Sequence, residues 1–88
     1  MDYYQIEFSR SAERDLRRLS PTIIQRVHAR IQSLSNNPRP RGAIKLSDGE
    51  NSHRIRIGDY RVIYNIDDTT KTIIINYIRH RREVYRQT

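Results

Sequence analysis

The segment HRIRIGDYRVIYNIDDTTKTIIINYI, residues 53–78, decides the fold of this chain. Basic and apolar side chains alternate over 53–57, a period of two that is typical of a β-strand with one buried face. A Gly-Asp pair then marks a tight turn or bulge. Residues 60–66 and 72–78 are rich in β-branched and aromatic side chains, and polar turn residues separate them. The segment therefore predicts three strands, with 72–78 as a central strand of the sheet.

The preceding part of the chain predicts a strand followed by two helices. Residues 4–8 alternate apolar and polar side chains, which again indicates a half-buried strand. Ser9 or Ser11 can cap the first helix, whose apolar residues recur at helical spacing over 12–19. A Ser-Pro step then ends this helix and starts a second one over 21–34, with proline at its favoured first position. Together the two helices make a helical hairpin.

These elements define one α+β domain that spans residues 1–88. A loop rich in proline and asparagine at 36–42 is followed by a short strand at 43–46, and residues 82–86 are expected to form a short C-terminal helix. The predicted order is an N-terminal strand, a two-helix hairpin, and a four-stranded, mainly antiparallel β meander with that terminal helix. We expect the helices to cover one face of the sheet.

The composition limits the classes of function. The chain has a net charge of +7 and no cysteine, which excludes disulfides and thiolate metal sites. No run approaches the roughly 18 apolar residues of a membrane-spanning helix. The N-terminus lacks the basic and apolar regions of a secretory signal. We therefore expect a cytoplasmic protein that does not associate with membranes.

Arginine supplies nearly all of the positive charge. Only Lys45 and Lys71 are lysines, so fifteen of the seventeen basic residues are arginine. A guanidinium offers a planar fork of donors that binds phosphate or carboxylate through two hydrogen bonds and stacks on bases. This preference favours nucleic acid or an acidic protein as partner over a merely solubilising surface.

One group of arginines surrounds the first turn of the deciding segment. Because Ile55 and Ile57 share one face of their strand, Arg54 and Arg56 share the other. Arg61 follows the turn, so a hairpin would bring it alongside this pair, with its side chain facing solvent. An ordinary solvated strand face is the alternative interpretation. The scarcity of nearby acidic residues favours a site for an anionic ligand.

A second basic stretch, RHRREVY at residues 79–85, follows the last predicted strand. At strand spacing, Arg79 and Arg81 would point one way and the histidine between them the other. Glu83 could pair with one of the neighbouring arginines and give it a structural role. Tyr85 is either an aromatic lid on the core or a residue that stacks on a base or supplies a reactive phenol.

Histidine chemistry is limited by position. His28 lies within a predicted helix, whereas His53 and His80 lie near the basic residues and could accept a proton. The three histidines are dispersed and share no carboxylate pattern, so we expect no metal site. No glycine-rich phosphate loop is present, and we expect no cofactor.

Two motifs carry a resemblance over essentially the whole chain. A strand with alternating basic residues runs into Gly-Asp-Tyr-Arg-Val-Ile-Tyr at 54–64, and a closing basic stretch ends in Glu-Val-Tyr at 79–85. With the opening FSRSAERDL at 8–16, the chain resembles the RelE/ParE toxin superfamily of bacterial type II toxin–antitoxin systems. The element order predicted above agrees with that family, and the motifs favour its RelE-like branch.

The resemblance implies a toxin that inhibits translation as a ribosome-dependent endoribonuclease. In that reaction a ribose 2′-hydroxyl of the mRNA attacks the adjacent phosphodiester, leaving a cyclic phosphate and a free 5′-hydroxyl. The implied partners are a cognate antitoxin, the ribosome and its message. Operator DNA would be bound only through the antitoxin complex.

The resemblance also implies catalytic residues. Arg61 matches the family's arginine that contacts the scissile phosphate, and Arg79 or Arg81 matches a second arginine. Tyr85 matches the C-terminal tyrosine. An arginine cannot usefully lose its proton, so it stabilises the transition state but does not act as base. Tyr85 is the favoured base, because surrounding arginines favour the phenolate form, and His80 is the second candidate.

Three further arginines are expected to bind RNA. Arg54 and Arg56 match the family's paired basic residues on the strand, although RelE-type enzymes often have lysine there. The spacing from this pair to Arg61 is also shorter than in the best-known pattern. Arg82 completes the expected RNA-binding set.

Two other functions stay open at this point. A ParE-like toxin would bind and poison DNA gyrase without cutting RNA, and that branch generally lacks the arginine–tyrosine constellation. A toxin with a decayed catalytic site would act only in a complex with its antitoxin and operator DNA. The presence of the arginines and Tyr85 favours the ribonuclease.

Overall fold

The computed structural model describes residues 3–46 and 51–80, and the predicted order of elements is confirmed in them. The predicted C-terminal helix at 82–86 lies outside the described residues. In chain order the elements are β1 (Gln5–Phe8), α1 (Arg10–Arg17), α2 (Pro21–Ser33), β2 (Ile44–Lys45), β3 (Ser52–Ile57), β4 (Tyr60–Asp67) and β5 (Thr72–His80).

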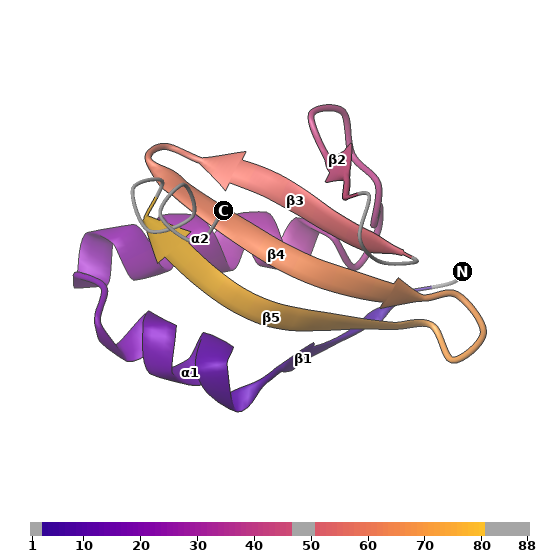
Figure 1. Cartoon of the computed structure of the whole chain (residues 1–88), viewed down its shortest axis with the longest axis horizontal. Coiled ribbons are helices and arrows are strands. Elements are labelled where there is room, and N and C mark those ends of the chain that lie inside the picture. Colours follow the sequence, from indigo (N-terminus) through magenta and orange to yellow (C-terminus); the bar gives the residue numbers. More distant parts are fainter. Residues whose placement is uncertain (1–2, 47–50, 81–88) are drawn as a thin grey trace.

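The strands form one sheet in the order β1-β5-β4-β3-β2 (Figure 1). Strands β2 to β5 form the predicted antiparallel meander, and β1 pairs with β5 in parallel. The strand β5 is internal, as predicted, but β4 occupies the middle of the sheet. The two helices carry the chain from β1 to the opposite edge of the sheet, where β2 begins the meander. The meander then returns to β1, so that β5 pairs with it in parallel through a long connection.

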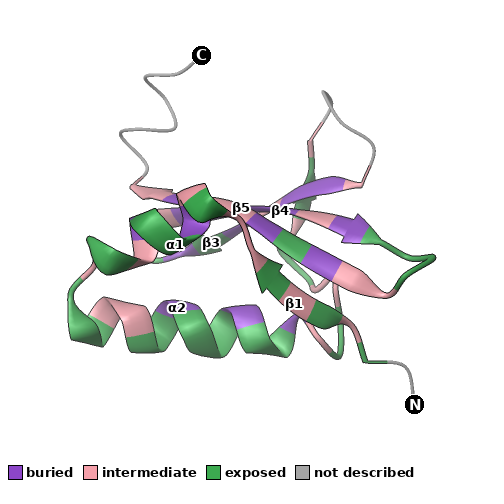
Figure 2. Cartoon of the chain, turned by 90° about the horizontal axis from the view of Figure 1, so that it is seen from below, coloured by how far each residue is buried: buried purple, intermediate pink, exposed green. Residues whose placement is uncertain are grey.

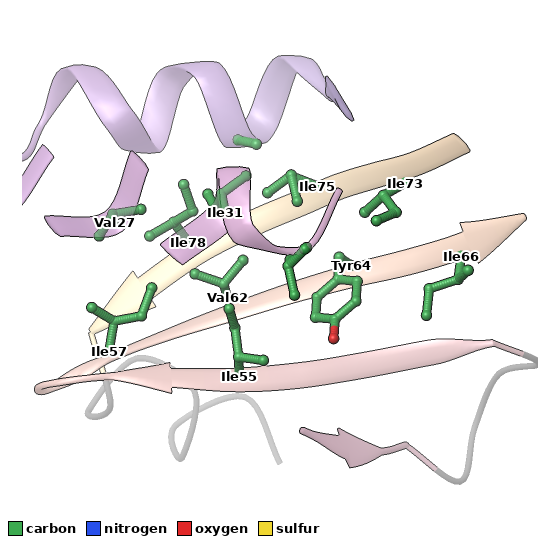
Figure 3. Close-up of a cluster of buried hydrophobic side chains, with 12 residues drawn as sticks. Val27, Ile31, Ile55, Ile57, Val62, Tyr64, Ile66, Ile73, Ile75 and Ile78 are labelled. Atoms are coloured by element: carbon green, nitrogen blue, oxygen red, sulfur yellow. The ribbon is translucent and has the colours of Figure 1, made fainter. Parts of the chain in front are cut away.

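Both helices pack on the sheet through their apolar stripes. The helix α2 runs beneath the sheet in Figure 2, while α1 packs along β5. The side chains of Val27 and Ile31 on α2 meet isoleucine and valine side chains of the three long strands (Figure 3). The core also takes in Tyr64, whose hydroxyl donates a hydrogen bond to the carbonyl of Pro38 at 2.7 Å. We call the sheet face turned away from α2 the open face.

Hydrogen bonds with the start of α1 and with its Asp15 side chain satisfy the edge of β5 that β1 does not reach. The strand β1 pairs with β5 only as far as Ile75. Of the two predicted caps, Ser9 is the one that caps α1. It donates from its backbone N–H to the Ile75 carbonyl at 2.9 Å and from its hydroxyl to the Asn76 carbonyl at 2.6 Å. Beyond it, the Asp15 carboxylate accepts the backbone N–H of Ile78 at 2.9 Å. Ser9 and the side chain of Asp15 therefore replace the missing strand partner.

A β-bulge in β5 decides which of its side chains face the core. Ile63 of β4 pairs with Tyr77 and the next residue, Tyr64, pairs with Ile75, so Asn76 is the extra residue. Strict alternation from Ile75 would have placed Tyr77 in the core. The bulge shifts the pattern by one residue, so that Ile78 is buried and the next residue turns to the open face.

An exposed ionic network joins three distant parts of the chain. Asp68, in the turn between β4 and β5, accepts two hydrogen bonds from the Arg39 guanidinium, at 2.9 and 3.3 Å. It also accepts the Tyr4 hydroxyl at 2.6 Å. The hydrogen bonds from Arg39 first, and that from Tyr4 second, lower the pKa of the Asp68 carboxyl to about 2.

This network predicts a specific acid sensitivity. Because the folded-state pKa of Asp68 is depressed, its contribution to the free energy of unfolding is fully present above pH 4 and is lost as the pH falls toward 2. We expect Asp68→Asn to flatten the fall in urea-unfolding free energy over that window. Glu7→Gln, at an exposed carboxyl on β1, is the matched control. Parallel pH profiles for wild type and Asp68→Asn would contradict the prediction.

Neither helix of residues 3–46 and 51–80 is long and apolar enough to cross a membrane.

Candidate functional site

Three arginines lie side by side across the open face. Arg56 of β3 pairs in register with Arg61 of β4, and Arg61 pairs with Arg79 of β5. We call these three residues the arginine row. Side chains that are directly opposite each other on neighbouring strands are close enough to interact, and like charges there are destabilising. The row therefore concentrates positive charge at one place on the open face.

Arg61 is the centre of the row, and it is buried. Only 7% of its surface is exposed, so the expectation that it faces solvent was wrong. It lies on the middle strand between two other arginines. The sequence showed only that Arg61 follows a turn, and a position beside a turn does not reveal that its strand is in the middle of the sheet. Its Nη1 donates to the carbonyl of Tyr60 at 3.3 Å, and no carboxylate of the described residues pairs with it. A buried guanidinium without a counter-ion is costly, which is typical of a site that binds an anion.

The predicted face of β3 is confirmed. Arg54 pairs in register with Ile63, so it shares the open face with Arg56. Arg54 is half-buried and Arg56 exposed. The Nε of Arg56 donates to the carbonyl of Gly58 at 3.0 Å, which directs this side chain along the hairpin. Neither arginine pairs with a carboxylate in the part of the chain that the structure describes.

Arg79 is held by two residues that sequence reasoning missed. Its Nε donates to the Asp15 carboxylate at 3.3 Å, and its guanidinium lies 4.7 Å from the centroid of the Tyr77 ring. The Asp15 side chain is 8% exposed. A signal for Asp15 existed, since it falls on the apolar stripe of α1 between Ala12 and Leu16, where an unpaired acid would be unfavourable. Tyr77 gave no such signal, because the bulge at Asn76 decides which face of the sheet its side chain lies on, and the bulge is not visible in the sequence.

His80 is not brought to the arginine row. Because it follows Arg79, it faces the helix side, as the predicted alternation requires. Its ring meets Tyr60 edge to face, with the centroids 5.4 Å apart. His53 also faces the helix side and stacks on Tyr64 at 5.7 Å. Burial raises the pKa of the Tyr64 phenol to about 12, so Tyr64 is no source of phenolate at neutral pH.

The remaining predicted residues are Arg81, Arg82 and Tyr85, and all three lie outside the described residues. In residues 3–46 and 51–80, no three histidine, aspartate or glutamate side chains gather in a way that could hold a metal ion. The described part of the site thus consists of the arginine row, Arg54 and the two residues that hold Arg79. Such a site can bind and neutralise a phosphate, but its described residues include no obvious base.

Comparison with known proteins identifies the family. Residues 6–85 match the family model described as the ParE toxin of the type II toxin–antitoxin system parDE. Toxin RelG of Mycobacterium tuberculosis is 33% identical over 96% of this chain and 98% of its own length. Toxin RelE of the same organism is 38% identical over 94% of this chain and 87% of its own length.

Solved structures agree with this assignment. The crystal structure of the toxin–antitoxin complex RelBE2 from Mycobacterium tuberculosis matches with a TM-score of 0.80 and 33% identity, covering 91% of this chain and 93% of that one. The archaeal RelE–RelB complex from Pyrococcus horikoshii matches with a TM-score of 0.80 and 29% identity, covering 92% and 97%. The chain therefore belongs to the RelE/ParE superfamily and is a RelE-family toxin of a type II toxin–antitoxin system.

Proposed function

We propose that this toxin is a ribosome-dependent endoribonuclease that cleaves mRNA and so inhibits translation. The observation that carries the proposal is Arg61, a buried guanidinium without a carboxylate partner among the described residues, with an arginine in register on each side. A scissile phosphodiester is the ligand that would neutralise this charge. A gyrase-binding surface gives no reason to keep an uncompensated arginine buried in the middle of a sheet.

The proposed chemistry is an internal transesterification. The 2′-oxygen forms a bond to phosphorus, and the bond from phosphorus to the 5′-oxygen breaks. The 2′-hydroxyl proton passes to a base, and the departing 5′-oxygen takes up a proton. Negative charge grows on the non-bridging oxygens in the transition state. Guanidinium groups already fixed around these oxygens stabilise that state more than the substrate.

Each residue of the site has a role in this proposal. Arg61, with Arg79 or Arg81, neutralises the scissile phosphate. Tyr85 is the favoured base. The position of His80 on the helix side places it away from the arginine row and supports its lower rank. The arginines that hold the neighbouring phosphates of the message are Arg54, Arg56 and Arg82.

The toxin is also proposed to bind a cognate antitoxin. The support is that relatives of the same fold are solved as complexes with RelB antitoxin. The excess of positive charge favours an antitoxin segment that is acidic or amphipathic. Operator DNA would be bound only by the toxin–antitoxin complex.

A gyrase inhibitor is the second candidate, favoured by the family model that bears the ParE description. A cell-free translation reaction, with primer extension on the message, separates the candidates. A ribonuclease gives new 5′ ends in the message only when ribosomes are present. A ParE-like toxin gives no new ends but inhibits supercoiling by purified gyrase. A decayed toxin does neither and still binds its antitoxin, which would overturn the proposal.

Tyr85→Phe tests the proposed base. Stacking on a nucleobase survives the loss of the hydroxyl, because the ring face remains, whereas proton transfer does not. We expect single-turnover cleavage to fall about a hundredfold, the lower end of what a positioned acid–base group contributes, with ribosome binding unchanged. Tyr77→Phe, on the open face beside Arg79, is the matched control and should cleave normally. A full loss in Tyr77→Phe instead would move the base to that phenol.

A further inference from the structure

A pocket lies under the tip of the β3–β4 hairpin, on the helix side of the sheet. Its volume is about 240 Å³. Two residues from the start of α2, Ile23 and Arg26, form one wall, and the hairpin residues 56–60 form the rest. Neither the binding of the scissile phosphate nor the proposed acid–base chemistry involves the interior of this pocket or Arg26.

Two arginines from different elements line this pocket, and both lie close to Gly58. Arg26 is exposed on α2, and its Nη2 lies 3.6 Å from the position that a Cβ on Gly58 would occupy. Arg56 approaches from the strand, since its Nε donates to the Gly58 carbonyl. Asp59 also lines the pocket, yet within the described chain it pairs with neither arginine. The pocket therefore keeps a net positive charge and unused guanidinium donors.

The tip of the hairpin beside this pocket is a tight turn. Gly58 has a φ of +59° and the next residue has a negative φ, the pattern of a two-residue hairpin turn with glycine first. A Cβ at this position would make only ordinary van der Waals contact with Arg26, so glycine is required by the backbone conformation of the turn. Tyr60 closes the pocket with a half-buried aromatic ring. Phosphate-binding donors and a stacking surface therefore lie together, as in sites for single-stranded nucleic acid.

We propose that this pocket binds a second phosphate of the RNA strand, next to the one held at the arginine row. The inference rests on the proposed ribonuclease function and extends it to the path of the substrate. Arg56 connects the two sites, because it is the register partner of Arg61 and also lines the pocket. A polyanion with regularly spaced charges can occupy both at once. The RNA strand then passes from the open face over the hairpin tip toward α2.

Binding of a short RNA tests this without requiring catalysis. The probe is a fluorescein-labelled 2′-O-methyl hexanucleotide, which lacks the attacking hydroxyl. Arg26→Ala should weaken its affinity about fivefold, as expected for loss of one partly exposed charged hydrogen-bonding group. The slope of log affinity against log salt should fall by about 0.7, the value for one phosphate contact with a single strand.

Arg30→Ala is the matched control, since it removes the same charge from an exposed position one turn further along α2. Equal affinities for Arg26→Ala and Arg30→Ala would overturn the proposal, as would failure of the wild type to bind the hexanucleotide at low salt. A hexaglutamate peptide is titrated in parallel. If Arg26→Ala weakens binding of the peptide but not of the RNA, the pocket is a carboxylate site and the proposal is wrong.

RNA affinity and message cleavage are measured separately, so the pocket and the proposed function can fail independently. If the wild type leaves ribosome-bound message intact but Arg26→Ala still weakens RNA binding, the catalytic proposal fails and the pocket stands. If Arg61→Ala abolishes cleavage but Arg26→Ala changes neither RNA affinity nor cleavage, the pocket fails and the catalytic proposal stands.

Discussion

Arg61→Ala is expected to reduce message cleavage by between about a hundredfold and a thousandfold, the loss seen when one preorganised donor is removed from a developing oxyanion. The physical reason is the position of the side chain. It is buried in the middle strand, so its guanidinium is fixed before the substrate arrives, and little reorganisation is needed at the moment of reaction. Single-turnover cleavage of ribosome-bound message measures the effect directly.

The same variant should not weaken the fold. Removing a buried charge that has no carboxylate partner among the described residues relieves a desolvation cost, and this offsets the packing lost with the methylene groups of the side chain. The urea midpoint of Arg61→Ala is therefore expected to equal or exceed that of the wild type. Arg14→Ala, at an exposed position on α1, is the control for loss of charge alone. A variant that unfolds easily and cleaves normally when folded would show that Arg61 is structural.

Arg61→Lys refines this expectation. Lysine keeps the charge but loses the planar fork of donors that binds two phosphate oxygens together. We expect it to recover part of the lost rate, but less than half of the lost activation free energy. Full recovery would mean that charge alone matters and that the geometry of the guanidinium contributes nothing.

The face of β3 could be predicted from the sequence because it depends on local rules. Alternation places Arg54 and Arg56 opposite Ile55, and a two-residue turn fixes which residue of β4 each will meet. The pairing of Arg56 with Arg61 follows from these two facts alone.

The position of Arg79 depends on features that local rules do not contain. Strict alternation along β5 from Ile75 would have sent Arg79 into the core and His80 to the open face. The bulge at Asn76 reverses both, and it forms where Ile78 has to reach the core. The prediction that Arg79 and His80 point in opposite directions needed no knowledge of the bulge. Predicting which of the two residues lies beside Arg61 requires the position of the bulge, and only the structure shows where the bulge is.

The burial of Arg61 was also beyond sequence reasoning. Turn proximity suggested exposure, and exposure is the usual state of arginine. Only the order of strands in the sheet shows that β4 is in the middle, with an arginine on each side of Arg61. A buried arginine departs from the rule that charged side chains lie at the surface, and such departures are expected at functional sites.

Asp15→Ala should be the most destabilising single change in the described part of α1. The Asp15 carboxylate accepts the backbone N–H of Ile78 at 2.9 Å and the Nε of Arg79 at 3.3 Å, in a nearly buried position. Alanine leaves both donors without this acceptor, which should cost about 3 kcal/mol of unfolding free energy. For a domain of this size such a loss lowers Tm by roughly 12–24 °C. Glu13→Ala, an exposed acid on the same helix, should cost only a few tenths of a kcal/mol.

Asp15→Asn separates the hydrogen bonds of that carboxylate from its charge. The same carboxylate oxygen accepts both hydrogen bonds, so an asparagine oxygen can still accept them and the edge of β5 keeps its partner. The negative charge that attracts the Arg79 guanidinium is lost. A double-mutant cycle of Asp15→Asn with Arg79→Ala measures the coupling between the two side chains, which should be about 1 kcal/mol or more for a pair that is mostly shielded from water. Cleavage by Asp15→Asn should fall even at temperatures where the domain is folded, because the ion pair that fixes the position of the Arg79 guanidinium is lost. If folded Asp15→Asn cleaves as fast as the wild type, then Asp15 supports only the sheet edge, and Arg79 needs no fixed orientation for the reaction.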